Sequence, residues 1–248
     1  MIKNNIGFRW SGFDWASEQK SIMLVGAGGI NSWVAFSLSR IMHELYIVDF
    51  DVVDETNVQG GQLYRTIDIG RTKVAAVKEI CRQFGCTNSI YDIPHSFSRE
   101  VGITPICITG LDNMATRKEV FELWEESLNK SINKEEHLLL DGRMNGELFE
   151  IFAIQGNNLE QIQEYKDNWL FSDSEVEELE CTRKSTTFVA MGIASFITAT
   201  LCNWLANKKM DAELKEVPFH QRFFVPFLDY KTESIEQIKS NANGTAIS

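Results

Sequence analysis

The sequence predicts an α/β protein whose sheet is parallel at least in its first part. Apolar strand-like segments and helix-like segments alternate from residue 21 to about residue 154, which is typical of strand–helix–strand units. A glycine cluster, GAGG at residues 26–29, separates the first apolar strand from the first helix. The chain has 248 residues, of which 44% are hydrophobic, enough for a substantial core in one large domain.

The first half of the chain alternates regularly. In the helix expected at 72–84, Val74, Val77 and Cys81 recur at helical spacing. The segment 49–70 before it is expected to be a loop. The remaining elements expected in this half are strands at 22–25, 45–48, 90–93, 105–109 and 137–141 and helices at 30–42 and 113–128.

The second half is expected to differ. Residues 147–154 alternate as a half-buried strand, and the polar, acidic stretch 155–184 is expected to be a crossover loop. Residues 186–206 are apolar nearly all round, which predicts a buried helix, and 215–227 suggests late, antiparallel strands. We therefore expect a single domain over residues 1–234, with helices on both faces of the sheet, and a polar, disordered tail over 235–248.

Composition argues against several classes of protein. The net charge of −11 disfavours a nucleic-acid binder, which usually presents a basic face. We find no run of about 18 apolar residues and no signal peptide, so we expect a cytoplasmic protein without a membrane span. The five cysteines form no CxxC pair and the four histidines are scattered, so neither zinc nor a disulfide framework is expected.

The glycine turn leaves two nucleotides open. Gly26 and Gly28 occupy two positions of the dinucleotide fingerprint, but the third is Asn31, where glycine normally lets helix and strand pack closely. Gly29 makes the turn GxGG, and amides at a helix start form an anion site. Asp49, which ends the second strand, suits ribose hydroxyls in either case. A tight turn without a ligand remains the plain alternative.

Four stretches favour ATP when taken together. GAGGINS, VDFDVVDETN, DIGRTK and LDNMATR occur in this order, and through them the chain resembles the ThiF/MoeB/ubiquitin-activating superfamily, and in particular its small, divergent bacterial or phage-type members. The resemblance runs from about Ile22 to Leu205. It implies a Rossmann-like ATP-binding sheet, ATP and Mg²⁺ as cofactors, and a homodimer. The implied activity is adenylation of the C-terminal carboxylate of a small ubiquitin-like or sulfur-carrier protein or peptide.

The resemblance also assigns residues by position. The glycines would cradle phosphate, Asp49 would hold the ribose and Asn57 would contact the phosphate region. Lys73 would neutralise developing charge, and Asp112 would hold Mg²⁺ beside the phosphates. Alternatively, Asp112 and Asn113 cap the following helix and Lys73 is a solvated lysine. The full nucleotide-binding set is Gly26, Gly28, Gly29, Asp49, Asp51, Asn57, Lys73, Asp112 and Asn113.

One departure from the superfamily affects catalysis. Relatives carry an Arg-Gln pair where this chain has Gly60 and Gly61, and that arginine is thought to grip an ATP phosphate. Loss of one such donor costs a factor of about 10²–10³ in rate. Arg143, which follows an expected strand, is our candidate substitute, and Arg65 or an Arg9 from a partner subunit are others. A surface salt bridge is the alternative for each arginine.

The cysteines fall into two groups. Cys81, Cys107 and Cys202 lie in apolar stretches and are expected in the core, whereas Cys86 has no evident role. Cys181 lies between the polar stretches SEVEELE and TRKSTT. The resemblance places a cysteine here, just before the long apolar helix, where it can accept an acyl group.

Two other functions compete with adenylation. Gly60 and Gly61 favour a catalytically weak nucleotide-binding interaction module of the same fold. A nicotinamide-dependent oxidoreductase is disfavoured by Asn31 and by the LDNMATR stretch.

Overall fold

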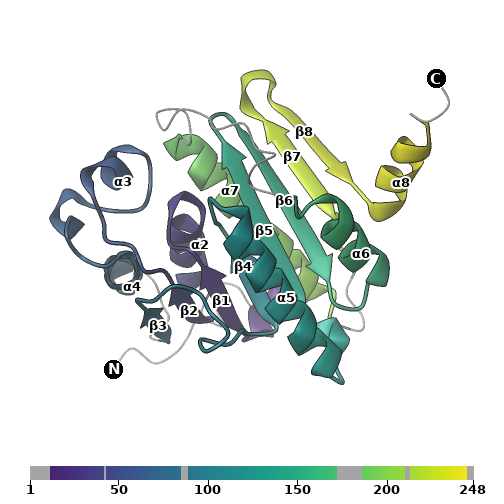
Figure 1. Ribbon diagram of the computed structural model, residues 1–248, viewed down its shortest axis with the longest axis horizontal. Coiled ribbons are helices and arrows are strands. Elements are labelled where there is room, and N and C mark those ends of the chain that lie inside the picture. Colours follow the sequence, from purple (N-terminus) through teal and green to yellow (C-terminus); the bar gives the residue numbers. More distant parts are fainter. Residues whose placement is uncertain (1–11, 42, 85–88, 172–185, 210–212, 245–248) are drawn as a thin grey trace.

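An eight-stranded mixed sheet forms the middle of the protein (Figure 1). The structure is a computed structural model and describes residues 12–41, 43–84, 89–171, 186–209 and 213–244. The sheet is parallel from β3 to β5 and antiparallel from β5 to β8, which confirms the predicted fold class. Its strands, in spatial order, are β3 (Ile90–Ile93), β2 (Glu44–Val48), β1 (Ser21–Val25), β4 (Ile106–Thr109), β5 (Leu138–Asn145), β6 (Leu148–Gln155), β7 (His220–Phe224) and β8 (Asp229–Glu233).

Helices cover both faces, as predicted. The longer described helices are α2 (Gly29–Ser39), α4 (Lys73–Phe84), α5 (Met114–Lys130), α6 (Leu159–Asn168), α7 (Thr187–Ala206) and α8 (Ile235–Gly244). Successive side chains of a strand point to opposite faces. Ile22 and Leu24 therefore pack with α2, α4 and α7, whereas Met23 and Val25 pack with α5 and α6. Figure 1 shows α5 and α6 on one side of the sheet, with α8 at the far end from the short helix α3 (Glu55–Gln59).

The edge where β1, β2 and β4 end, which we call the carboxyl edge, is the functional edge in open α/β sheets. The loops that follow these strands carry the glycine turn, Asp49 and Asp112. Because β1 pairs in parallel with both β2 and β4, the sheet brings these three loops together.

The apolar helix predicted at 186–206 is confirmed as α7. It has the length and composition of a membrane-spanning helix, with a mean hydropathy of 1.6, so the expectation that no such stretch exists is wrong. In the structure, 56% of this segment is buried. Ile193 and Ile197 belong to the apolar layer shared with α2, so α7 serves here as a core helix.

Three segments expected to lack structure contain helices. The segment 155–184 contains α6, which begins at an Asn158 cap and buries Ile162 and Tyr165; residues 172–185 lie outside the described part. The loop 49–70 contains α3 and a 3₁₀ turn at Thr66–Asp68. The tail contains α8, and Ile235, only 3% exposed, packs against the core. Residues 235–244 are therefore helical and not disordered, and the placement of the domain boundary at residue 234 stays a prediction.

We expect Ile235→Ala to lower the free energy of unfolding by about 2–4 kcal/mol, because it removes a buried side chain and leaves a cavity. Ile132→Ala is the matched control, since Ile132 is 98% exposed and its truncation should change stability by less than about 0.5 kcal/mol. Urea unfolding of both variants measures the difference. Equal, small losses in the two would show that α8 adds nothing to the core.

Candidate functional site

The glycine turn between β1 and α2 requires glycine for two different reasons. Gly26 has φ +85°, and a Cβ there would lie 2.9 Å from the carbonyl oxygen of Gly110. These two features make glycine necessary at position 26. A Cβ on Gly29 would lie 2.3 Å from Cε of Met144, the flexible end of a side chain, so a larger residue there needs only this methionine to move. At Gly28, by contrast, a Cβ would meet nothing within 4 Å, so open space lies beside this residue.

This open space lies at the start of a helix. The Ser32 amide donates the first backbone hydrogen bond of α2, to the Gly28 carbonyl at 3.1 Å, so the amides before it point out of the helix end. Such amides, with the helix dipole, favour an anion. The turn therefore offers groups that suit an anion, and the binding of phosphate there stays a prediction.

Asn31 explains how the turn does without a third glycine. Its side chain is fully buried, and Nδ2 donates to the carbonyls of Val25 at 2.9 Å and Ile108 at 3.2 Å. Val25 is the last residue of β1, and Ile108 is the second-to-last residue of the neighbouring strand β4. Gly110 leaves room for this amide, because a Cβ on Gly110 would lie 3.1 Å from Asn31 Cγ. Asn31 thus joins the ends of β1 and β4 by hydrogen bonds. In a dinucleotide fingerprint, the glycine at this position only allows helix and strand to pack closely.

Asp49 lies beside the turn and fixes its backbone. Oδ2 accepts from the Ala27 amide at 2.6 Å, and Oδ1 accepts from the Asp51 amide at 2.7 Å. Each carboxylate oxygen keeps a further lone-pair site. Asp49 can therefore shape the turn and still accept a hydrogen bond from a ribose hydroxyl.

Lys73 is the first residue of α4 and is only 7% exposed. Its Nζ lies 2.7 Å from Oδ2 of Asp51, whose side chain is half exposed. The ammonium is thus held at the carboxyl edge, and the interpretation of Lys73 as a solvated lysine is wrong. Asp51 contributes by positioning Lys73.

Asn57 has a local role in the structure. Its Oδ1 accepts from the Asp54 amide at 3.0 Å, and its own amide donates to Asp54 Oδ1 at 2.8 Å. The pair forms a reciprocal cap of α3. Contact between Asn57 and phosphate stays a prediction.

Asp112 and Asn113 follow β4, and both are exposed. Asn113 caps α5 by accepting from the Thr116 amide at 2.8 Å, as the capping alternative proposes, and its Nδ2 lies 3.3 Å from Asp112 Oδ1. Within the described ranges, no three His, Cys, Asp or Glu side chains are grouped to hold a metal. Asp112 is the single carboxylate offered from β4, which suits Mg²⁺ that takes its other ligands from phosphates and water.

Behind this edge lies a buried charged cluster centred on Asp141 of β5. This carboxylate is fully buried and lies 3.2 Å from Nε of Arg117 and 2.7 Å from Nε of Arg143. Thr109 and Tyr165 donate to it at 2.6 and 2.8 Å. Burial alone would raise the pKa of Asp141, but the two guanidinium groups outweigh it and hold that pKa below its ordinary value.

Sequence reasoning missed the role of Arg117, the last residue of LDNMATR. The side chain is 5% exposed and also donates to the Leu111 carbonyl at 2.7 Å, so it fixes the loop that carries Asp112. Two features of the sequence could have indicated this role. Arg117 lies on the apolar face of α5, and Asp141 ends an apolar stretch. Two opposite charges in buried positions indicate a pair.

Arg143 lies within β5 and not after it. It donates to Asp141 and, at 2.8 Å, to the Trp169 carbonyl, and its guanidinium lies 4.7 Å from the ring centre of Phe152. Its contacts are with the α6 side of the sheet, whereas a Cβ on the neighbouring Gly142 would face Ile30 and α7. Its role as a substitute phosphate ligand stays a prediction, and Nε and Nη2 of this arginine already have hydrogen-bond partners.

Arg65 also has partners. It donates to Asp68 at 2.9 Å and to Glu79 at 3.2 Å, and these hydrogen bonds to the two carboxylates raise the pKa of Arg65. The salt-bridge alternative describes this residue. Arg9 lies outside the described residues.

The absence of the relatives' glutamine at position 61 has a steric explanation. Gly61 has φ +86°, and a Cβ there would lie 2.6 Å from Cα of Thr187, the first residue of α7. The Gly61 carbonyl also accepts from Nε1 of Trp33 at 2.8 Å. Backbone and helix approach so closely that no larger residue fits at position 61.

The cysteines expected in the core are there. Cys81, Cys107 and Cys202 are free and buried, and burial raises the pKa of Cys81 to about 12 and that of Cys202 to about 11. At neutral pH these thiols stay protonated and are poor nucleophiles. Cys86 and Cys181 lie outside the described residues.

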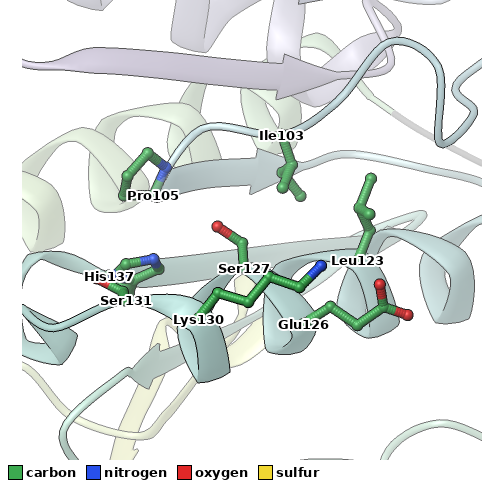
Figure 2. A pocket seen from close by; sticks show the side chains of 8 residues that line it. All are labelled: Ile103, Pro105, Leu123, Glu126, Ser127, Lys130, Ser131 and His137. Carbon is green, nitrogen blue, oxygen red and sulfur yellow. The ribbon is translucent and has the colours of Figure 1, made fainter.

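A surface groove of about 400 Å³ lies at the opposite edge of the sheet (Figure 2). Pro105 and His137, which directly precede β4 and β5, line one side of it, and Ser127 and Lys130 near the end of α5 line another. Its position separates it from the glycine turn, so the groove is not part of the candidate site.

The fold and the site define a Rossmann-like α/β protein with a glycine-rich anion site at its carboxyl edge. Its parallel strands place an acidic residue after β2, a buried lysine at the start of α4 and a carboxylate after β4 around that site. The chain belongs to the ThiF family, because the sequence model of that family matches residues 14–243.

Individual relatives are more distant. Adenylyltransferase and sulfurtransferase MOCS3-1 of Zea mays is 28% identical over 133 residues, which cover 51% of this chain and 28% of that protein. Among solved structures, PaaA matches with a TM-score of 0.65 at 14% identity, over 90% of this chain and 66% of its own. Escherichia coli MccB with ATP matches with a TM-score of 0.65 at 15% identity, over 90% and 65%. At these identities the structural likeness shows the fold, and this chain spans less than two thirds of each relative.

We expect Asp141→Asn to lower the free energy of unfolding at pH 7 by about 3–5 kcal/mol, because the buried Arg117 and the partly buried Arg143 lose their counter-charge. The folded-state pKa of Asp141 is lowered, so its contribution is present above the unfolded pKa of about 3.9 and is lost as pH falls through the folded pKa. The difference between wild type and variant should therefore shrink below about pH 4. Urea unfolding across pH measures it.

Asp229→Asn is the control for this experiment. Asp229 is exposed and pairs at 3.1 Å with the exposed Lys231, and exposed ion pairs of this kind contribute little to stability. A loss in Asp141→Asn that stays constant down to pH 3 would contradict the assigned charge.

Proposed function

We propose that the protein adenylates, with ATP, the C-terminal carboxylate of a small ubiquitin-like or sulfur-carrier protein or of a peptide. The observation that carries the proposal is the open helix start at Gly28, flanked by Asp49 and the buried Lys73. Membership of the ThiF family supports it, as do the name of the maize relative and the structures of MccB with ATP and with MccA.

The chemistry explains why this set of residues is useful. A carboxylate resists nucleophiles because its oxygen is a poor leaving group. When a carboxylate oxygen attacks the α-phosphorus of ATP, a new P–O bond forms and the bond to pyrophosphate breaks. Pyrophosphate leaves with the electron pair, and the acyl adenylate formed can lose AMP easily. Catalysis then consists of positioning and of stabilising phosphate charge.

Residues of this chain supply both. The amides at the start of α2 would hold phosphate oxygens, and Asp49 would orient the nucleoside through a ribose hydroxyl. Lys73 would neutralise charge as pyrophosphate forms, and its burial keeps the ammonium in place without reorganisation.

Mg²⁺ fits the donors present. Four carboxylates, Asp49, Asp51, Asp54 and Asp112, lie in the loops of the carboxyl edge, and Lys73 is already paired with one of them. Triphosphate would add negative charge to this acidic edge. A divalent cation held by Asp112 would supply the missing positive charge.

A nucleotide-binding interaction module is the second candidate function. Two observations favour it: Gly61 leaves no room for the family glutamine or any larger residue, and the candidate substitute Arg143 is held by Asp141 and Trp169. Such a module would bind ATP without exchanging pyrophosphate. The homodimer and the cytoplasmic location expected from the sequence belong to the proposal as well, and they rest on family resemblance and composition.

We expect the protein to bind Mg·ATP and not NAD⁺ in calorimetry, and Asp112→Ala to lower substrate-dependent pyrophosphate exchange at least about 100-fold because the metal loses its protein ligand. Asp167→Ala, which removes an exposed carboxylate of α6, is the control and should keep full exchange. Circular dichroism checks that both variants are folded.

Three outcomes separate the candidates. NAD⁺ binding without ATP binding would overturn the nucleotide assignment. ATP binding without exchange in wild type, tested with Gly-Gly-ending carrier proteins and peptides, would favour the interaction module. Full exchange in Asp112→Ala would remove this residue from the metal site.

We further propose that Cys181 accepts the acyl group after adenylation. The described residues on either side support this: Phe171 lies near the guanidinium of Arg143 on β5, and Thr186 donates to the Gly146 carbonyl beyond β5. Both flanks thus lie where β5 runs past the carboxyl edge. Transfer would form a thioester from the Cys181 thiolate and release AMP.

We expect Cys181→Ala to keep ATP binding and pyrophosphate exchange but to lose any thiol-labile adduct, as seen by mass spectrometry of protein incubated with ATP and an acyl partner. Cys202→Ala is the control: it should lower stability by about 1 kcal/mol as a small core truncation and keep the adduct. Transfer that survives in Cys181→Ala would make adenylation alone the chemistry of the protein.

A further inference from the structure

Both backbone groups of Ala27, in the middle of the glycine turn, are held by side chains. The Ala27 amide donates to Asp49 at 2.6 Å, and the Ala27 carbonyl accepts from the Tyr64 hydroxyl at 2.5 Å. Ala27 is fully buried and Tyr64 is 7% exposed, so no solvent replaces either contact. Asp49 is also the residue proposed to bind ribose, whereas the Ala27 carbonyl is the hydrogen-bond partner of the Tyr64 hydroxyl among the described residues.

Holding this carbonyl also aims an amide. The peptide bond is planar and trans, so the N–H of Gly28 points away from the C=O of Ala27. A hydrogen bond that fixes the carbonyl therefore fixes the direction of the Gly28 N–H. That N–H lies at the start of α2, where the space beside Gly28 is open, and the hydroxyl that aims it lies on the buried side.

Tyr64 is itself held in place by α2. The loop that carries Tyr64 makes two hydrogen bonds with α2. The Leu63 amide donates to Ser32 Oγ at 3.1 Å, and Trp33 Nε1 donates to the Gly61 carbonyl at 2.8 Å. Burial raises the pKa of Tyr64 well above its usual range, so the hydroxyl stays protonated and remains a donor at every physiological pH.

We propose that Tyr64 is a positioning residue for the triphosphate: through the Ala27 carbonyl it orients the Gly28 amide towards a phosphate oxygen. This rests on the proposed function, since it requires that the turn binds ATP. Only the phosphates depend on this amide, so the hydroxyl contributes to the binding of ATP and not to the binding of adenosine.

Tyr64→Phe tests this by removing only the hydroxyl. Calorimetry with Mg·ATP and with adenosine should show ATP affinity reduced about tenfold, the size expected for one charge-assisted hydrogen bond, and adenosine affinity within about twofold of wild type. The measured quantity is the ratio of the two affinities. A residue that merely stabilises the fold would lower the melting temperature and leave this ratio unchanged.

Two controls separate the hydroxyl from general effects. Tyr230→Phe removes a comparable hydroxyl, which donates to Gln221 at 3.0 Å on β7, and should leave both affinities unchanged. Trp33→Phe loosens the same loop but keeps the Tyr64 hydroxyl, so the ratio should stay near that of wild type. If Trp33→Phe lowers the ratio as much as Tyr64→Phe, anchoring of the loop and not the hydroxyl is responsible, and the proposal is wrong.

The remaining outcomes are distinct. Wild type that binds no ATP refutes the proposed function, and the role of Tyr64 with it. Wild type that binds ATP, with an unchanged ratio in Tyr64→Phe, refutes only the role of Tyr64.

Discussion

The carboxylate of Asp141 joins the elements that support the carboxyl edge. It lies at the end of the parallel part of β5, and its partners come from β4, α5, α6 and β5 itself through Thr109, Arg117, Tyr165 and Arg143. A buried ion pair gains little net stability over apolar packing, but removal of one partner is costly. The cluster therefore acts mainly as a constraint on geometry. Arg117 extends that constraint to Leu111, and so to the loop that presents Asp112.

In the glycine turn, too, buried or partly buried side chains fix the positions of backbone groups. Asn31 joins the ends of β1 and β4, Asp49 holds the Ala27 amide, and Tyr64 holds the Ala27 carbonyl. Each of these side chains approaches from the protein side. The open side keeps the amides at the start of α2, and preorganised amides of this kind stabilise charge without reorganisation. A turn constrained in this way suits the repeated binding of phosphate.

Much of the parallel half could be predicted from the sequence, because its signals are local. An apolar strand, a glycine turn and an amphipathic helix identify β1, α2 and α4 without knowledge of the rest of the chain. The helices α6 and α8 were missed because they are short and mostly polar, and only positions such as Tyr165 and Ile235 show that they pack. Their burial depends on tertiary contacts that no local pattern reveals.

The candidate site divides in the same way. Motif positions such as Gly26 and Lys73 lie where the sequence suggested, since parallel strands gather their following loops. The face of the sheet to which the Arg143 side chain points could not be predicted, because it depends on whether β5 continues past the edge. Within a strand, a shift of one residue turns a side chain to the other face. From the sequence alone, Gly61 indicates only that the glutamine of the relatives is missing. The structure shows that Thr187 lies too close to this position for a side chain.

The last strand of the sheet limits how copies of the chain can meet. β8 is an edge strand whose sequence, DYKTE, carries charges at alternate positions, and four of its five residues are exposed. Charged edge strands discourage the addition of a strand from another molecule, which is a common route to aggregation. A polar strand at this position keeps the sheet finite. If two copies associate, a continuous sheet formed through β8 is therefore disfavoured.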